Sequence, residues 1–449
     1  MKIYRKWVIL LAMMLLPMLL GGCMMSVSVE DLYSLPSLPE EYQALSERIN
    51  EVLSAGAEYT SPTSGTNLQS VQLEDLNGDG NQEALAFFRN TSEERPLKIY
   101  IFRAVEGGYE QAAVIEGSGT SIHSIRYEDM DRDGVKELLV SWRVSAEVQA
   151  MAVYSLDNME PALLMSAAYA RYDVVDLDGD DMLELVVLRS DETGVSLADY
   201  YDWDESSLLL QSSARLSMSV AELQWVQTGA LSSGETAVFV TGRVTGVEET
   251  SRAVTDILVY RQPELTNIVV NSDTGVSSQI ARFLNLQPTD INNDGVTEVP
   301  MPAQLPSEGD TNYWKIFWFS YDADGTSTPQ ALTYHNLTDS WYLLIPKEWD
   351  GRFTVRQDNT SSTAHATTFY TCSDGNEVGD ELFTIYSFTG SNRDNLGTMG
   401  GRSILRRQPN VIYAVYCTQT YADWRYAVGQ DILAGRFSPI LTQWSTDEN

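Results

Sequence analysis

One acidic pattern occurs four times in the sequence, and its residue types and spacing suit the binding of a cation. Oxygen-bearing side chains stand at its first, third, fifth and ninth positions, where alternate residues of a tight loop can converge. Glycine at the sixth position of three copies permits the left-handed backbone that turns a chain around an ion. The four copies are Asp75, Asn77, Asp79 and Glu83; Asp129, Asp131, Asp133 and Glu137; Asp176, Asp178, Asp180 and Glu184; and Asp290, Asn292, Asp294 and Glu298.

Calcium fits this pattern better than magnesium does. Ca²⁺ accepts six to eight oxygens in loose geometry, whereas Mg²⁺ requires a strict octahedron and retains its waters. An EF-hand loop closes with glutamate at its twelfth position between two helices, but here glutamate stands at the ninth and apolar runs flank the loops. At about 5 Å and an effective dielectric of about 20, each pair of carboxylates costs on the order of 3 kcal/mol. We therefore expect calcium to be a folding cofactor.

The elements that must hold these loops are short β-strands. From about residue 65 to 335, apolar or alternating runs are separated by turns, and one run follows each loop. The loops begin at residues 75, 129, 176 and 290, so the intervals are 54, 47 and 114 residues, the last being about two periods. The missing unit falls near Gly229, where Gly234 and the apolar run 237–240 remain but the acidic side chains are absent. The spacing predicts five units of three or four strands each.

This repeated loop resembles the FG-GAP/VCBS-type calcium repeats of integrin-α-like β-propellers. The resemblance covers residues 60–335 and implies a mainly β fold with a five-unit β-propeller-like repeat domain. The strand near Leu68–Leu73 is expected to close the ring against the last unit, and an open stack of units is the alternative. About four calcium sites are implied, because the unit at Gly229 has no ligand set. Asp181 replaces the turn glycine of the third loop and must adopt the left-handed conformation.

The resemblance also assigns the ligands of each site. The side-chain ligands are those of the four loops given above, and one backbone carbonyl from the seventh position joins each set. These carbonyls belong to Asn81, Val135, Met182 and Val296.

The first residues of the chain read as a targeting segment. Lys2, Arg5 and Lys6 precede the apolar run Trp7–Leu20, which would span about 21 Å as a helix and falls short of a bilayer core of roughly 30 Å. The ending Leu-Gly-Gly-Cys23 resembles the lipobox of bacterial lipoproteins. By that resemblance residues 1–22 are a signal peptide and Cys23 carries a lipid. Residues 23–59 would then hold a tether and an amphipathic helix that begins near Pro39.

The charge balance excludes some partners. The chain has 29 Lys+Arg against 63 Asp+Glu, so it offers no basic face for a nucleic acid. Removing residues 1–22 takes away three basic residues and leaves 26 − 63 = −37. An anionic bilayer surface repels such a protein, and the lipid must provide the anchor. We expect the protein to lie at the extracytoplasmic face of the bacterial cell membrane.

Residues 336–449 do not continue the period, and strand-like runs followed by a helix near 426–437 predict a small α+β domain there. Cys372 and Cys417 could form a disulfide or remain free thiols. Four tryptophans could form a sugar-stacking platform, although at strand spacing they suit a core; they are Trp314, Trp318, Trp341 and Trp349.

The sequence names no catalytic residue. The three histidines lie outside any zinc-type spacing, and neither an H-E-x-x-H motif nor a G-x-S-x-G elbow occurs. We therefore expect a binding or scaffold module for an extracellular protein or glycan. The alternative is a cell-surface hydrolase acting on envelope or extracellular polymers, which would require a deep pocket with convergent acidic or histidine groups.

Overall fold

The computed structural model describes residues 40–146, 148–204, 207–245, 251–271, 274–282, 284–307, 311–373 and 377–440. Strands make up 52% of the described residues and helices 10%, which confirms the prediction of a mainly β protein. The predicted signal peptide, Cys23 and the tether lie outside the described residues. Within the described part, none of the helices has the length and apolar character needed to cross a bilayer.

Helix α2 (Glu40–Ser54) forms where the 3.6-residue spacing predicts an amphipathic helix. Leu45 and Ile49 are buried on one face, against Ala86 and Phe88 of the first sheet. Gly56 follows the helix with a φ of +98°, the left-handed conformation that commonly ends helices. The helix therefore covers one face of the first sheet.

The described strands form six antiparallel sheets, which follow one another along the chain. The first sheet holds β1 (Glu58–Tyr59), β2 (Val71–Glu74), β3 (Glu83–Arg89), β4 (Leu97–Val105) and β5 (Gly108–Gly117). The second holds β6 (Ser121–Glu128), β7 (Glu137–Arg143), β8 (Gln149–Ser155) and β9 (Ala162–Tyr169). The third holds β10 (Arg171–Val175), β11 (Glu184–Ser190), β12 (Ser196–Asp204) and β13 (Ser207–Arg215).

The fourth sheet holds β14 (Leu223–Ala230), β15 (Thr236–Thr245), β16 (Ser251–Arg261), β17 (Glu264–Asn267) and β18 (Ile280–Arg282). The fifth holds β19 (Val299–Gln304), β20 (Trp314–Tyr321), β21 (Ser327–Asn336), β22 (Trp341–Leu344) and β28 (Phe437–Pro439). The sixth has the order β23-β24-β25-β27-β26. Its strands are β23 (Phe353–Asp358), β24 (Ala364–Cys372), β25 (Val378–Phe388), β26 (Ser403–Arg407) and β27 (Ile412–Cys417).

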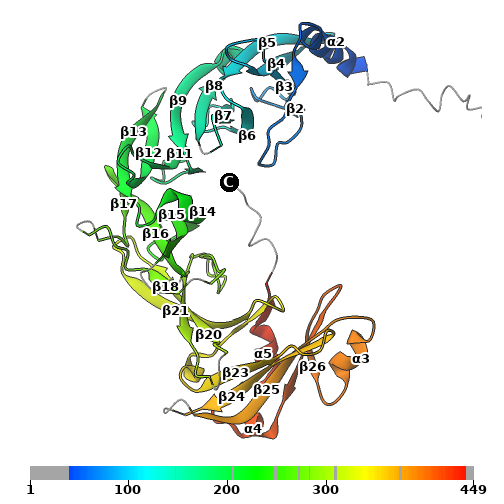
Figure 1. Cartoon of the computed structure of the whole chain (residues 1–449), viewed down its shortest axis with the longest axis vertical. Helices are drawn as coiled ribbons and strands as arrows, with labels where there is room; N and C mark the ends of the chain where they lie inside the picture. Colours follow the sequence, from blue (N-terminus) through cyan, green and yellow to red (C-terminus); the bar gives the residue numbers. More distant parts are fainter. Residues whose placement is uncertain are drawn as a thin grey trace, which may run out of the picture.

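Each sheet packs face to face on the next one. Strands β3, β7 and β11 lie inside their sheets and are buried on both faces, which explains their nearly continuous apolar sequences. One cluster of buried side chains joins each pair of neighbouring sheets. Members from the two sheets are, in order, Phe87 and Leu138, Leu139 and Leu185, Val186 and Val238, Phe239 and Val299, and Trp341 and Phe369. The sheets follow an open arc (Figure 1).

The strand predicted to close a ring does not do so. Strand β2 pairs antiparallel with β3 of its own sheet, from Val71 opposite Ala86 to Glu74 opposite Glu83. The acidic loop after Glu74 turns the chain back at once, so the nearest hydrogen-bonding partner is the following strand. The closure predicted for residues 68–73 is therefore wrong for the described chain.

The last part of the chain is connected to the fifth sheet. Strand β22 pairs with β21, and β28 pairs with β22, so the predicted boundary at residue 336 falls within this sheet. Three short helices accompany the sixth sheet: α3 (Arg393–Thr398), α4 (Gln419–Asp423) and α5 (Gln430–Gly435). Single 3-10 turns span Asp157–Met159, Val220–Glu222 and Lys347–Trp349.

Two open questions about side chains in this region are answered. Trp318, Trp341 and Trp349 are fully buried and Trp314 is partly buried against the fifth sheet, so these rings belong to the core and form no sugar-stacking platform. Cys372 and Cys417 are free thiols.

Candidate metal centres

The four acidic loops occupy the same place in four sheets, between the first strand and the next. The first three connect β2 to β3, β6 to β7 and β10 to β11. The last one precedes β19, and a bridge between Thr289 and Glu298 takes the place of the first strand. The repeated sequence therefore produces a repeated position, on one edge of successive sheets.

Each loop has the same internal hydrogen bonds. The backbone N–H of the fifth residue donates to the side-chain oxygen of the third, and the N–H of the seventh donates to the fifth. In the third loop these bonds join Asp180 N to Asp178 Oδ1 at 3.1 Å and Met182 N to Asp180 Oδ1 at 2.8 Å. The other loops repeat both bonds. The backbone thus holds the acidic side chains on the inner side of the turn.

The closing glutamate of every loop is buried. Glu83, Glu137, Glu184 and Glu298 are each at most 2% exposed. Each Oε2 accepts a hydrogen bond from the backbone N–H of the second loop residue, over 2.7 to 3.1 Å. The second oxygen, Oε1, has no hydrogen-bond partner in Glu83 or Glu184. A buried carboxylate oxygen without a partner is costly, and a bound cation would satisfy it.

Burial also changes the acidity of these glutamates. Loss of hydration is the main cause and raises the pKa of Glu137 to about 7, of Glu184 to about 8 and of Glu298 to about 7. Neighbouring loop aspartates raise these pKa values further, while the backbone N–H bond lowers them. The pKa of Glu83 is raised for the same main reason. Without a bound cation, the ionised form of each closing glutamate is therefore disfavoured.

The loops differ in how closely their carboxylates converge. In the third loop, ligand atoms of Asp176, Asp178, Asp180 and Glu184 lie within 4.8 Å of one another, and in the second loop those of Asp129, Asp131 and Glu137 do. Asp133 stands outside that group. In the first and last loops the asparagine nitrogen donates to the fifth-position carboxylate, over 3.2 Å from Asn77 to Asp79 and 2.9 Å from Asn292 to Asp294. The asparagine amide there donates to a carboxylate oxygen that a bound cation would otherwise satisfy.

The backbone of each loop is left-handed at two positions. The sixth residue has φ of +86°, +91°, +77° and +86° in Gly80, Gly134, Asp181 and Gly295. The left-handed conformation expected of Asp181 is therefore confirmed. The fourth position, which we did not predict, is left-handed too: Gly78, Arg132, Gly179 and Asn293 have φ between +60° and +83°. Glycine at this position in two loops and asparagine in a third were the signal for it.

Successive loops are joined by one recurring hydrogen bond. The N–H of the eighth residue donates to the carbonyl of the second residue in the preceding unit: Lys136 to Leu76 at 2.7 Å and Leu183 to Met130 at 2.7 Å. Glycine permits the close approach, since a Cβ on Gly78 would lie 2.6 Å from the Gly134 carbonyl oxygen. We call this line of loop-to-loop contacts the seam.

The unit near Gly229 keeps the seam toward the last loop but lacks the ligands. Its turn lies between β14 and β15, and Ala230 accepts a hydrogen bond from Thr297 N at 2.9 Å, as the seam requires. Gly234 has a φ of +101° at the sixth position. Leu231 is 1% exposed where the other loops have an aspartate or asparagine. An apolar side chain thus occupies the third loop position, where the acidic loops have a ligand.

The predicted carbonyl ligands lie at the seventh positions of these turns. The N–H groups of Asn81, Val135, Met182 and Val296 all donate to the fifth-position carboxylate. The arrangement as a whole can bind a hard cation. Comparison with protein-family models finds no match, and comparison with curated proteins finds no relative. The loop geometry therefore carries the functional argument.

Proposed function

We propose that this chain is a calcium-binding lipoprotein that acts as a binding or scaffold module for an extracellular protein or glycan. A lipid on Cys23 would hold it at the extracytoplasmic face of the bacterial cell membrane. The loops need a medium rich in calcium, since extracellular modules of this kind bind it with dissociation constants of about 10⁻⁴ to 10⁻³ M. The proposed location and the proposed cofactor therefore support each other.

The observation that carries the proposal is the buried closing glutamate. Four glutamates at the same loop position are buried, and each Oε2 accepts from the backbone N–H of the second loop residue. Hydrogen bonds between aspartates and the loop backbone orient further oxygens toward the same place. A divalent cation would neutralise these groups together, whereas a neutral polar surface turn would not need a buried carboxylate.

The proposed fold is a five-unit, β-propeller-like repeat domain in open form, followed by a small α+β region. Its support is the common order of strand, loop and strand in four consecutive sheets, with an isolated bridge in place of the first strand in the fifth. In this arrangement calcium would act on the seam. An ion in the second loop, for example, would fix the turn whose Met130 carbonyl accepts from Leu183 of the third loop. Calcium would thereby stiffen the packing of one sheet on the next.

The test is a metal-dependent melting curve of the purified full chain. A chelator should lower the melting temperature, and Ca²⁺ should restore it more fully than Mg²⁺. Each site that binds only the folded chain adds about 2.7 kcal/mol when free calcium is 100 times its dissociation constant. Elemental analysis should find close to four ions per chain. An unchanged melting curve with no bound metal would refute the calcium assignment.

A further inference from the structure

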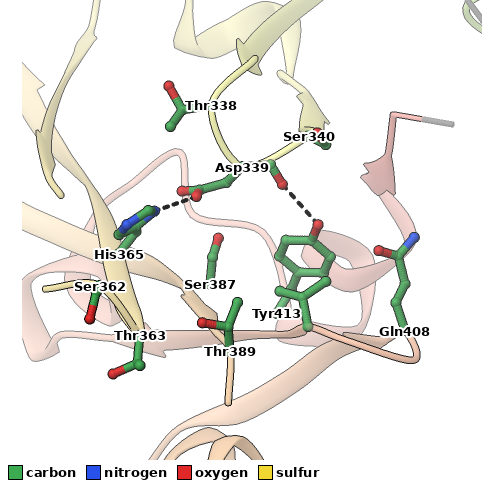
Figure 2. Close-up of a pocket in the computed structure, with 11 residues that line it drawn as sticks. Thr338, Asp339, Ser340, Ser362, Thr363, His365, Ser387, Thr389, Gln408 and Tyr413 are labelled. Carbon is green, nitrogen blue, oxygen red and sulfur yellow. Dashed lines mark hydrogen bonds and ion pairs between the residues drawn. The ribbon is translucent and has the colours of Figure 1, made fainter. Parts of the chain in front are cut away.

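A polar pocket lies between the fifth and sixth sheets, away from the acidic loops. Its volume is about 370 Å³, within the usual range for small-molecule sites. The turn between β21 and β22 forms one wall, and the ends of β24, β25 and β27 form the others (Figure 2). Seven of its eleven lining residues carry a hydroxyl group: Thr338, Ser340, Ser362, Thr363, Ser387, Thr389 and Tyr413.

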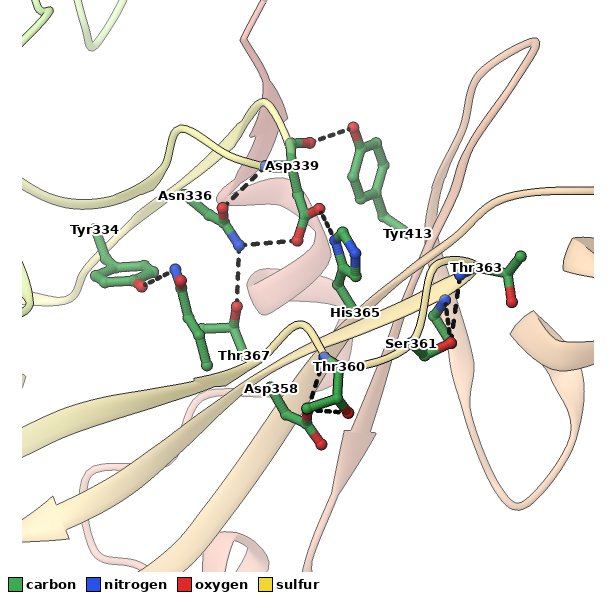
Figure 3. A network of polar contacts seen from close by, with 12 residues as sticks. Tyr334, Asn336, Asp339, Asp358, Thr360, Ser361, Thr363, His365, Thr367 and Tyr413 are labelled. Atoms are coloured by element: carbon green, nitrogen blue, oxygen red, sulfur yellow. Dashed lines mark hydrogen bonds and ion pairs between the residues drawn. The ribbon is translucent and has the colours of Figure 1, made fainter. Parts of the chain in front are cut away.

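Asp339 is fixed at the centre of a hydrogen-bond network (Figure 3). Its Oδ1 lies 2.5 Å from His365 Nδ1, and its Oδ2 accepts from Asn336 Nδ2 at 3.0 Å. Asn336 is fully buried and also donates to Thr367 Oγ1 at 3.1 Å. The Asp339 carbonyl accepts from the Tyr413 hydroxyl at 2.8 Å. The carboxylate therefore has little freedom to move when a ligand enters.

His365 lines the pocket, and Asp339 holds its ring. An ionised carboxylate only accepts hydrogen bonds, so the bond to Asp339 places a proton on Nδ1. The other nitrogen, Nε2, has no hydrogen-bond partner among the described residues. Because Asp339 fixes the ring, Nε2 is available to a ligand in one orientation.

Ser387 is the second group without a partner. It stands opposite His365 in the register of β24 and β25, so both side chains are on the same face of the sheet. It is 4% exposed, and its Oγ has no hydrogen-bond partner in the described chain. The oxygen points into the space beside Asp339 and His365 (Figure 2). A buried hydroxyl of this kind indicates a ligand or water that completes it.

The charge of the lining restricts the ligand. No lysine or arginine is among the residues that line the pocket, so a phosphate or carboxylate would find no counter-charge. The one carboxylate, Asp339, is already engaged by His365 and Asn336. An uncharged ligand that can form hydrogen bonds with many hydroxyl groups at once fits this lining, and a polyol is such a ligand.

We propose that this pocket binds a neutral saccharide unit through His365 Nε2, Ser387 Oγ and the surrounding hydroxyls. Saccharide hydroxyls both donate and accept, which matches a lining of serine and threonine side chains. This assignment selects the glycan within the proposed binding role, and it does not depend on the calcium loops.

The test is saturation-transfer NMR on the calcium-loaded full chain. The probes are glucose, galactose, mannose and N-acetylglucosamine, each as the free sugar and as a short oligosaccharide, with acetate, whose methyl protons are observable, as the charged control. At least one neutral sugar should receive saturation, and acetate should not. Ser387→Ala should weaken binding about tenfold, the effect of losing one or two hydrogen bonds. His365→Phe should abolish binding.

Ser141→Ala is the matched control, because Ser141 is 1% exposed in the second sheet and lies outside the pocket. It should bind the sugar as the wild type does. Melting each sample with and without a chelator tests the calcium assignment separately, so failure of one proposal can be told from failure of the other. The pocket assignment would be overturned if no sugar received saturation. It would also be overturned if Ser387→Ala and His365→Phe bound the sugar as strongly as the wild type does.

Discussion

At the scale of single residues, substitution of a buried glutamate can distinguish the effect of its charge on stability from the effect of a bound cation. Glu184→Gln retains an oxygen for the Leu177 N–H but removes the carboxylate. Without calcium, the variant should melt at or above the wild-type temperature, because a buried group with an unpaired oxygen is replaced by a neutral amide. With calcium at 100 times its dissociation constant, the variant should lack about 2.7 kcal/mol of stabilisation. Melting curves with calcium and with chelator measure both effects.

Glu192→Gln is the control for this change. Glu192 is exposed in a turn of the same sheet and loses the same charge. Its melting temperature should stay close to that of the wild type in both media. A loss of the calcium effect in Glu192→Gln, or its retention in Glu184→Gln, would contradict the site.

Asp256 makes stability depend on pH. It is fully buried on β16 and accepts from both the backbone N–H and the hydroxyl of Ser217, at 2.7 and 2.6 Å. Loss of hydration outweighs these bonds and raises its pKa from 3.8 to about 6. The folded chain therefore holds this proton more tightly than the unfolded chain does. The resulting stability is complete below pH 4 and is lost as the pH rises through about 6.

Asp256→Asn should remove this dependence. Between pH 4 and pH 7 the unfolding free energy of the wild type should fall, relative to that of the variant, by an amount on the order of 3 kcal/mol. Urea unfolding of both proteins at the two pH values measures the difference, in which the contributions of the calcium loops cancel. A constant difference across this range would show that Asp256 does not titrate there.

Single residues also show how far the sequence alone could lead. Asp181 could be predicted to be left-handed because the other loops have glycine at its position. Arg132 could not, since arginine rarely adopts that conformation and only the loop hydrogen bonds impose it. The Asp339–His365 pair was beyond sequence reasoning, because a turn in one sheet and a strand in the next bring the two residues together.

At the scale of elements, the seam can be tested by two glycines of one loop. Gly78 and Gly80 are both left-handed, so alanine at either position should cost about 1 kcal/mol through backbone strain. At Gly78 the new Cβ would also lie 2.6 Å from the Gly134 carbonyl oxygen, whereas at Gly80 no heavy atom lies within 4 Å. Gly78→Ala should therefore lose about 1–3 kcal/mol more than Gly80→Ala. Chemical denaturation in chelator measures both, and equal losses would argue against the seam.

The elements also explain which predictions of architecture succeeded. The loop spacing marked the turns that precede β3, β7, β11, β15 and β19, including the one at Gly229, which lacks acidic residues but keeps a left-handed glycine and an apolar run. Ring closure by residues 68–73 could not be judged, since pairing between distant strands leaves no local pattern. The same reason hides the pairing of β28 with β22 across roughly a hundred residues.

At the scale of the whole molecule, the anchor can be tested separately from the fold. Cys23→Ser should leave the protein unprocessed or release it into the medium, because the folded part carries a strong negative charge and has no affinity of its own for an anionic bilayer. Cys417→Ser, which removes a free thiol from the sixth sheet, should remain bound to the membrane. Fractionation of cells expressing each variant measures this. Normal processing and membrane retention of Cys23→Ser would exclude the lipid.

The open arc has a consequence for reach. Helix α2, where the described chain begins, covers the first sheet, and the polar pocket lies beside the sixth, at the other end of the arc (Figure 1). If the chain is held at its first residues, the intervening sheets act as a rigid spacer that places the pocket far from the anchored end. Each described sheet adds to the length of that spacer, because it packs on its neighbours. Removal of calcium from one loop would loosen the contact between two neighbouring sheets. The position of the pocket relative to the anchored end would then change, although the pocket residues themselves would not.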